Sequence, residues 1–246
     1  MARRAHVFSY SLIVENDRLP TIAEKVPPSD RKISAARAIH QRLLEFFGPP
    51  DWGAPLPPLD ELVSTILSQN TNDANRDRAF RALRRQFPTW EAVRDAAPGE
   101  VVTAIRTAGL ANQKGPRIQA VLREITAQRG ALDLEFLRQW PAEQVHDWLM
   151  SFKGVGPKTT AIVLLFSLGK PAFPVDTHIF RVTGRLGLRP AEMGVEQAHD
   201  YLAGLFLPET YGPAHLNLIR LGREVCQARK PNCPACPVQD LCEYPK

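Results

Sequence analysis

Four cysteines near the end of the sequence have side chains that could hold a metal group. Six, two and five residues separate Cys226, Cys233, Cys236 and Cys242. Four thiolates suit either a zinc ion or a [4Fe–4S] cluster, but structural zinc sites usually contain two close Cys-x2-Cys pairs, and this loop has one. We expect no disulfide here, because residues 1–10 lack the uninterrupted apolar stretch of a secretory signal and the thiols are crowded together. The spacing favours an iron–sulfur cluster modestly and leaves zinc open.

Lys158 carries the amine most suited to nucleophilic chemistry. It follows Gly154-Val155-Gly156-Pro157, which predicts a tight turn between two helices with Pro157 in the first turn of the second. Two glycines let a backbone approach a ligand such as a DNA phosphate, and a helix start directs N–H groups outward. A cation at that end of a helix is mildly unfavourable, which hints at function. An ordinary helix connection with a solvated lysine is the alternative, since this motif is weak by itself.

Asp176 is the carboxylate that could act with this amine. It lies in the segment Phe173-Pro-Val-Asp-Thr-His-Ile-Phe-Arg-Val182. A structural role is also expected, because aspartate is a favoured N-cap and an apolar helical stripe follows. Asp176 alone therefore establishes no function.

Helical spacing of apolar residues dominates the chain, which predicts an all-α protein. Residues 1–33 hold a β-like stretch at Val7–Val14, and we expect them to form a poorly ordered N-terminal extension. A helical stripe then runs from Ile33 to Phe47 and ends at Gly48-Pro49-Pro50. Further helices are predicted at 59–69, 74–86, 89–96, 98–107, 113–128, 133–138, 141–151, 157–168, 177–187, 195–206 and 212–226.

Composition places the 246 residues among globular proteins, with 44% hydrophobic and 23% charged residues. No apolar run is long enough for a membrane span, so we expect no membrane partner and a cytoplasmic location. The net charge of +5 permits a polyanionic partner without requiring one.

Taken together, these motifs resemble the endonuclease III family of DNA-repair glycosylases, in the helix-hairpin-helix superfamily with a Gly/Pro…Asp loop. The resemblance covers residues 34–244 and rests on four features in order. They are Leu67-Ser-Gln-Asn-Thr-Asn-Asp73, the hairpin Gly154–Thr159, the segment Val175–Arg181 and the cysteine loop. It implies two helical domains with an active cleft between them. These are a six-helix barrel at 58–170 and a discontinuous [4Fe–4S] cluster domain formed by 34–57 and 171–246.

The resemblance also implies an activity. The enzyme would be a bifunctional DNA glycosylase and AP lyase that removes oxidised pyrimidines such as thymine glycol. Its partner would be double-stranded DNA with damaged bases or abasic sites, and the protein would be a monomer at the nucleoid of a prokaryote. Lys158 would attack C1′ of a flipped nucleotide and Asp176 would stabilise the positive charge that develops on the sugar.

Further residues match positions that contact DNA in the family. Leu110 matches a wedge in the opposite strand, although core packing is an equal alternative. Asn70 stands where a glutamine normally fills the gap left by the flipped base, and Gln69 is one place earlier. Two hairpin positions depart from the family, because Lys153 replaces a usual proline and Pro157 a usual basic residue. The remaining expected DNA contacts are Gly154, Val155, Gly156, Thr177, His178, Arg229 and Lys230.

Three other functions stay open at this point. The departures at Asn70 and Lys153 motivate a non-catalytic iron–sulfur protein that binds DNA or responds to redox state, since a fold does not fix a function. A zinc-stapled DNA-binding module is the second alternative. A mismatch-type glycosylase with the same fold is the third, although such relatives generally lack the lysine.

Overall fold

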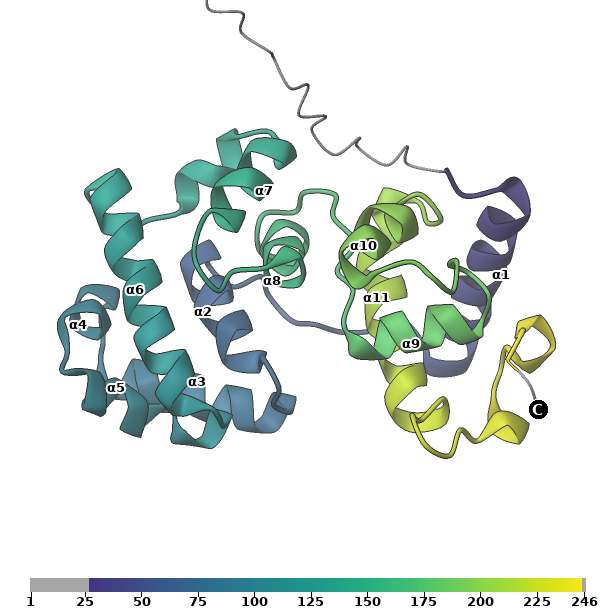
Figure 1. The fold of residues 1–246 in the computed structure, drawn as a ribbon, viewed down its shortest axis with the longest axis horizontal. Helices are drawn as coiled ribbons and strands as arrows, with labels where there is room; N and C mark the ends of the chain where they lie inside the picture. The colour runs from purple at the N-terminus through teal and green to yellow at the C-terminus, as the bar shows by residue number, and fades with distance from the viewer. Residues whose placement is uncertain (1–26, 245–246) are drawn as a thin grey trace, which may run out of the picture.

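A computed structural model describes residues 27–244, and every regular element in that range is a helix. The all-α prediction is therefore confirmed. The stretch Val7–Val14 lies outside the described residues. Within that range, no helix has the length and apolar character needed to cross a membrane. Figure 1 shows two groups of helices side by side, with α8 near their junction.

The first group is built from a continuous part of the chain. Its elements are α2 (Pro58–Ser68), α3 (Asp73–Gln86), α4 (Trp90–Asp95), α5 (Pro98–Ala104), α6 (Ala111–Arg129), α7 (Ala142–Met150) and α8 (Pro157–Ile162), with short 3-10 turns η1 (Arg106–Ala108) and η2 (Glu135–Gln139). Apolar residues between Leu59 and Leu168 form one buried core. Ile66 and Leu122, for example, are completely buried in it. Removing so much apolar surface from water holds this group together.

The second group combines both ends of the described chain. It contains α1 (Asp30–Phe47), α9 (Thr177–Arg185), α10 (Val195–Ala203), η4 (Pro208–Thr210) and α11 (Tyr211–Arg220), followed by the short turns η6 (Cys233–Ala235) and η7 (Gln239–Leu241). Its separate core joins Ile39 and Leu43 of α1 to residues from Phe173 to Val238. In Figure 1, α1 accordingly packs beside α11 and the C-terminal segment.

The buried residues of the two cores fall within the ranges expected for the two domains, 58–170 and 34–57 with 171–246. One boundary needs correction, because α1 begins at Asp30 rather than after the expected extension at 1–33. The first turn of α1 consists of the polar residues Asp30, Arg31 and Lys32, so the spacing of apolar residues could not locate it. An acidic residue such as Asp30 is nevertheless favourable at a helix N-terminus, where it meets the positive end of the helix dipole.

Four predicted α-helices are not regular throughout, and one of them, 98–107, passes from α5 into the 3-10 turn η1. In place of the helix predicted at 133–138 the structure has the 3-10 turn η2 (Glu135–Gln139), whose start is fixed by a hydrogen bond from the Glu135 N–H to the Asp133 carboxylate at 2.8 Å. The runs 157–168 and 212–226 change to π-helix at η3 (Val163–Ser167) and η5 (Leu221–Val225). Apolar periodicity cannot foresee such turns, since a π-turn shifts the period by a single residue.

Candidate active site and DNA-binding surface

Lys158 occupies the first turn of α8, directly after Pro157 and the hairpin glycines. Its Nζ lies 3.4 Å from the hydroxyl oxygen of Ser68, at the end of α2. The side chain is half-buried. Burial lowers the pKa of Lys158, mainly by removing water from the ammonium, while the carboxylate of Asp176 opposes the shift. The neutral amine, which is the nucleophilic form, is therefore more favoured in this site than it would be in bulk water.

Charged side chains from the barrel helices also act on this amine. Glu61 and Asp73 attract the ammonium and raise its pKa, whereas Arg76 lowers it. Burial raises the pKa of Glu61, whose carboxylate accepts a hydrogen bond from the Thr65 hydroxyl at 3.1 Å. Sequence reasoning missed Glu61 as a neighbour of Lys158. Its spacing from Thr65 and Ser68, four and then three residues along α2, was the available signal of a shared polar face.

Asp176 caps α9, as predicted. Its Oδ1 accepts a hydrogen bond from the Ile179 N–H at 2.8 Å. Two buried histidines hold the preceding backbone, with His199 Nδ1 at 3.1 Å from the Phe173 carbonyl oxygen and His215 Nδ1 at 2.9 Å from that of Pro174. Burial lowers the pKa of His215 to about 4, so the ring is neutral near pH 7 and its Nδ1 carries the donated hydrogen. The backbone that leads to Asp176 is therefore held in place by hydrogen bonds at Phe173 and Pro174.

An ion pair joins the two helical groups beside this site. Arg223 Nη1, in η5, lies 2.7 Å from the Asp73 carboxylate at the start of α3. Burial of Asp73 alone would raise the pKa of its carboxyl group, but the positive charges of Arg223 and Arg76 outweigh this effect and lower the pKa. The sequence separation of 150 residues explains why sequence reasoning missed the pair.

Gln69 and Asn70, the two candidates for filling the gap of a flipped base, have different surroundings. Gln69 Nε2 donates to the Gly154 carbonyl at 3.4 Å, and its Oε1 accepts from Arg117 Nη1 at 2.7 Å. Asn70 is exposed and has a φ of 52°, in the left-handed region. Gln69 is held against the hairpin, and Asn70 is the more exposed of the two side chains.

Leu110 is exposed to 47% and has a φ of 51°. The alternative that it packs in the core is therefore wrong. Among residues 27–244, Asn70 and Leu110 are the only residues other than glycine with positive φ. Such conformations cost energy and concentrate at functional positions.

The hairpin presents backbone rather than large side chains. Gly154 has a φ of 92° and lies against the Arg117 side chain, whereas nothing lies within 4 Å of the place where a Gly156 β-carbon would be. Val155 is buried in the barrel core, so only its backbone can face a ligand. The Lys153 side chain is exposed.

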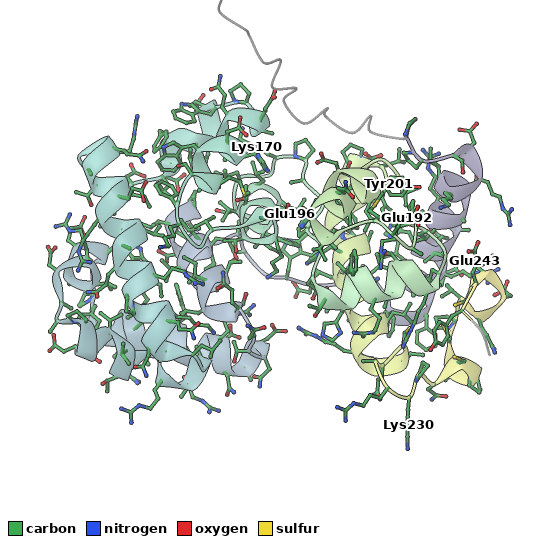
Figure 2. The ribbon with its side chains drawn as sticks, in the orientation of Figure 1. Lys170, Glu192, Glu196, Tyr201, Lys230 and Glu243 are labelled. Carbon is green, nitrogen blue, oxygen red and sulfur yellow. The ribbon has the colours of Figure 1, made fainter. Side chains whose placement is uncertain are left out.

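The remaining predicted DNA contacts belong to the second group. Thr177 is exposed at the first position of α9, and the His178 ring lies 3.3 Å from Arg181 Nη2. Arg229 and Lys230 are exposed in the loop after Cys226, and Figure 2 shows Lys230 extending outward from it. These two cations lie on the cysteine loop, which runs along the lower edge of the second group in Figure 1.

The four cysteines line one cavity, together with apolar residues such as Val182 and Leu221. In the described part of the chain, no three His, Cys, Asp or Glu residues are grouped closely enough to hold a metal ion. Four thiols that line one cavity provide the ligand type that iron–sulfur groups use. Arg185, which sequence reasoning missed, braces the loop by donating to Cys226 Sγ at 3.4 Å and to the carbonyls of Gln227 and Ala228, both at 2.8 Å.

Family models match both parts of the chain. Residues 63–205 match the HhH-GPD superfamily of base excision DNA repair proteins, and residues 226–242 match the iron–sulfur binding domain of endonuclease III. Endonuclease III of Sulfolobus acidocaldarius is 34% identical over 185 residues, which is 74% of this chain and 80% of that protein. A putative DNA glycosylase of Arabidopsis thaliana is 46% identical over 132 residues, but the match covers 54% of this chain and only 45% of the plant protein.

A solved structure of a trapped covalent intermediate of endonuclease III with DNA superposes with a TM-score of 0.73. The sequences are 26% identical, and the match covers 86% of this chain and 95% of the other. The chain therefore belongs to the HhH-GPD superfamily of base excision DNA repair proteins and, within it, to the endonuclease III family of DNA glycosylases. Its C-terminal segment is an iron–sulfur binding domain.

Proposed function

We propose that the protein is a bifunctional DNA glycosylase and AP lyase that removes oxidised pyrimidines such as thymine glycol. The observation that carries the proposal is the position of Lys158. Its amine is half-buried, has a lowered pKa, and is influenced by the carboxylate of Asp176 on the opposite group of helices. A poised amine beside a carboxylate is the arrangement that covalent catalysis at a sugar carbon requires.

The chemistry begins when the damaged nucleotide leaves the base stack. The lone pair of the Lys158 amine attacks C1′, and the bond from C1′ to the base breaks with its electron pair moving to the base, which leaves after gaining a proton. Ring opening of the sugar gives a Schiff base between the lysine nitrogen and C1′. Loss of a C2′ proton then expels the 3′ phosphate by β-elimination, which cuts the strand.

Asp176 has two roles in the proposed mechanism. One carboxylate oxygen caps α9 through the Ile179 N–H. The negative charge stabilises positive charge as it develops on the sugar, where a fixed charge costs no reorganisation. Because His199 and His215 hold the preceding carbonyls, the carboxylate does not need to move into place.

Double-stranded DNA would lie across both groups of helices. Asn70 and Leu110 would enter it from the barrel side, and the exposed backbone of the hairpin would meet the phosphates. Arg229 and Lys230 would contact phosphates from the cysteine loop, with Thr177 and His178 closer to the cleft. The matched structures of endonuclease III with DNA support this placement.

The cofactor we propose is a [4Fe–4S] cluster held by Cys226, Cys233, Cys236 and Cys242. The four thiols line one cavity, and the single Cys-x2-Cys pair in their spacing supports a cluster over a zinc ion. When bound, the cluster would cross-link the last segment of the chain through four thiolate bonds. Arg185 would keep the first loop in shape and so present Arg229 and Lys230.

Strand cleavage tests the proposal. Purified protein is incubated with one duplex carrying thymine glycol and another carrying an abasic site, with Lys158→Gln as control. We expect cleavage of both duplexes by the native protein and of neither by the variant. Cleavage of the abasic duplex alone would keep the lyase chemistry and reject the proposed lesion. Binding without cleavage of either duplex would support a non-catalytic DNA-binding protein instead.

A further inference from the structure

Lys114 is a buried lysine that the chemistry above does not use. Its side chain is 1% exposed, at the start of α6. The Nζ donates to the carbonyl oxygens of Leu67 at 2.7 Å and of Ala108 at 2.8 Å. Buried lysines are rare and need polar partners, so the site is built to hold an amine.

These two carbonyls belong to the segments that lead to the proposed DNA-entering residues. Leu67 is near the end of α2, three residues before Asn70, and Ala108 ends η1, two residues before Leu110. The last carbonyls of a helix have no partner within it and carry its negative dipole end. A single ammonium therefore satisfies the ends of two separate elements.

The turn that follows in α6 makes a second connection of the same kind. Arg117, three residues after Lys114 and so on the same face of the helix, donates to Gln69 and packs on Gly154. Asn70 and Leu110 are also the two residues whose left-handed backbone must be held against strain. The first turns of α6 thus contact the backbone or side chains beside three DNA-facing loops.

We propose that Lys114 is a positioning residue that couples the Asn70 loop to the Leu110 loop, so that both side chains enter DNA at a fixed separation. This inference rests on the proposed function of Leu110 as a wedge. Burial lowers the pKa of Lys114 to about 8, so most of the ammonium is retained near pH 7. Its hydrogen bonds to the carbonyls are then charge-assisted and stronger than neutral ones.

A double-mutant cycle tests the coupling. The variants are Lys114→Met, which keeps the length without the donor, Leu110→Ala, and the two combined. All are made on a Lys158→Gln background, so that binding is separated from chemistry. The readout is the fluorescence of 2-aminopurine placed opposite an abasic site, which rises when the base is unstacked. Affinity for undamaged duplex is measured beside it, and Lys170→Met serves as control because Lys170 also donates to a carbonyl, that of Arg138 at 3.0 Å.

We expect Lys114→Met to reduce the fluorescence response about tenfold, the effect of losing charged hydrogen bonds, with undamaged-DNA affinity nearly unchanged. Adding Lys114→Met to Leu110→Ala should then cost little more, since coupled residues are non-additive. Lys170→Met should have no effect. If Lys114→Met does not fold, Lys114→Gln replaces it in the same cycle, because its amide is uncharged and ends one atom short of the position from which Nζ donates to both carbonyls.

The failures are distinguishable. Independent, multiplying losses from Lys114 and Leu110 would overturn the coupling, as would an unchanged response in a folded Lys114 variant. An unchanged response in Leu110→Ala alone would instead reject the wedge and with it this part of the proposed function.

Discussion

The side chain of Arg117 lies against the backbone of Gly154, in the space that a β-carbon there would fill. Two residues later in the same turn, Gly156 has an ordinary φ of −115°, and beyond its chain neighbours no protein atom lies within 4 Å of the place its β-carbon would take. The fold thus requires glycine at position 154, whereas the absence of a side chain at Gly156 leaves open space at the protein surface.

Alanine substitutions separate these two roles. Gly154→Ala should destabilise the protein by about 1–3 kcal/mol, because its φ is strained for any side chain and Arg117 must shift. Gly156→Ala should fold with native stability but bind DNA more weakly, because its methyl group enters the space proposed for a phosphate. Urea denaturation and DNA titrations check both. Equal stability losses, or native DNA binding by Gly156→Ala, would contradict the assignment.

Asp176 can be tested in the same way, because its two roles need different atoms. Asp176→Asn keeps an oxygen that can accept from the Ile179 N–H, so stability should hardly change while base excision is severely reduced. Asp176→Ala loses the cap as well and should cost about 1 kcal/mol. Thermal unfolding and single-turnover excision are measured on both variants. Full excision by Asp176→Asn would remove the carboxylate from the chemistry.

The pKa of Lys158 predicts the pH dependence of the reaction. Only the neutral amine attacks, and burial lowers its pKa from 10.5, so the single-turnover rate on an abasic duplex should rise with pH and level off below that value. Asp176 attracts the ammonium and holds the pKa up. Asp176→Asn should therefore move the inflection to lower pH. An inflection that stays in place or moves upward would show that Asp176 does not act on this amine.

Arg229 and Lys230 should contribute to DNA affinity through charge alone. Replacing both with glutamine should weaken binding to every duplex alike and reduce the slope of log K against log salt by about 1.8, which is about 0.9 for each lost phosphate contact. Binding is titrated at several salt concentrations, with Arg78→Gln and Arg81→Gln on exposed α3 as the matched control pair. An unchanged slope would place the cysteine loop outside the DNA interface.

Local patterns predicted much of this structure. Apolar periodicity located the main helices because each buries one stripe, and Asp176 was expected as a cap because side-chain oxygens bond nearby N–H groups. Cysteine spacing indicated the metal-binding segment. The family of the chain followed from motifs in order, as the comparisons confirm.

Long-range contacts could not be predicted in this way. Lys114 has the sequence context of a solvated lysine, and only the folded chain brings it to two carbonyls 47 and 6 residues away. The Asp73–Arg223 pair joins two groups of helices and leaves no local pattern. Nor does the sequence say that Gln69 is held by Arg117 and that Asn70 is exposed, since both are polar residues in one turn.

Borohydride trapping tests the central claim most directly, because the reagent reduces a Schiff base to a stable covalent bond. Native protein and Lys158→Gln are each treated with borohydride on a thymine glycol duplex and on an abasic duplex. A covalent protein–DNA adduct on both duplexes, absent from the variant, is the expected result. An adduct that persists in Lys158→Gln would assign the chemistry to another amine, and native protein that binds both duplexes without any adduct would contradict the proposed mechanism.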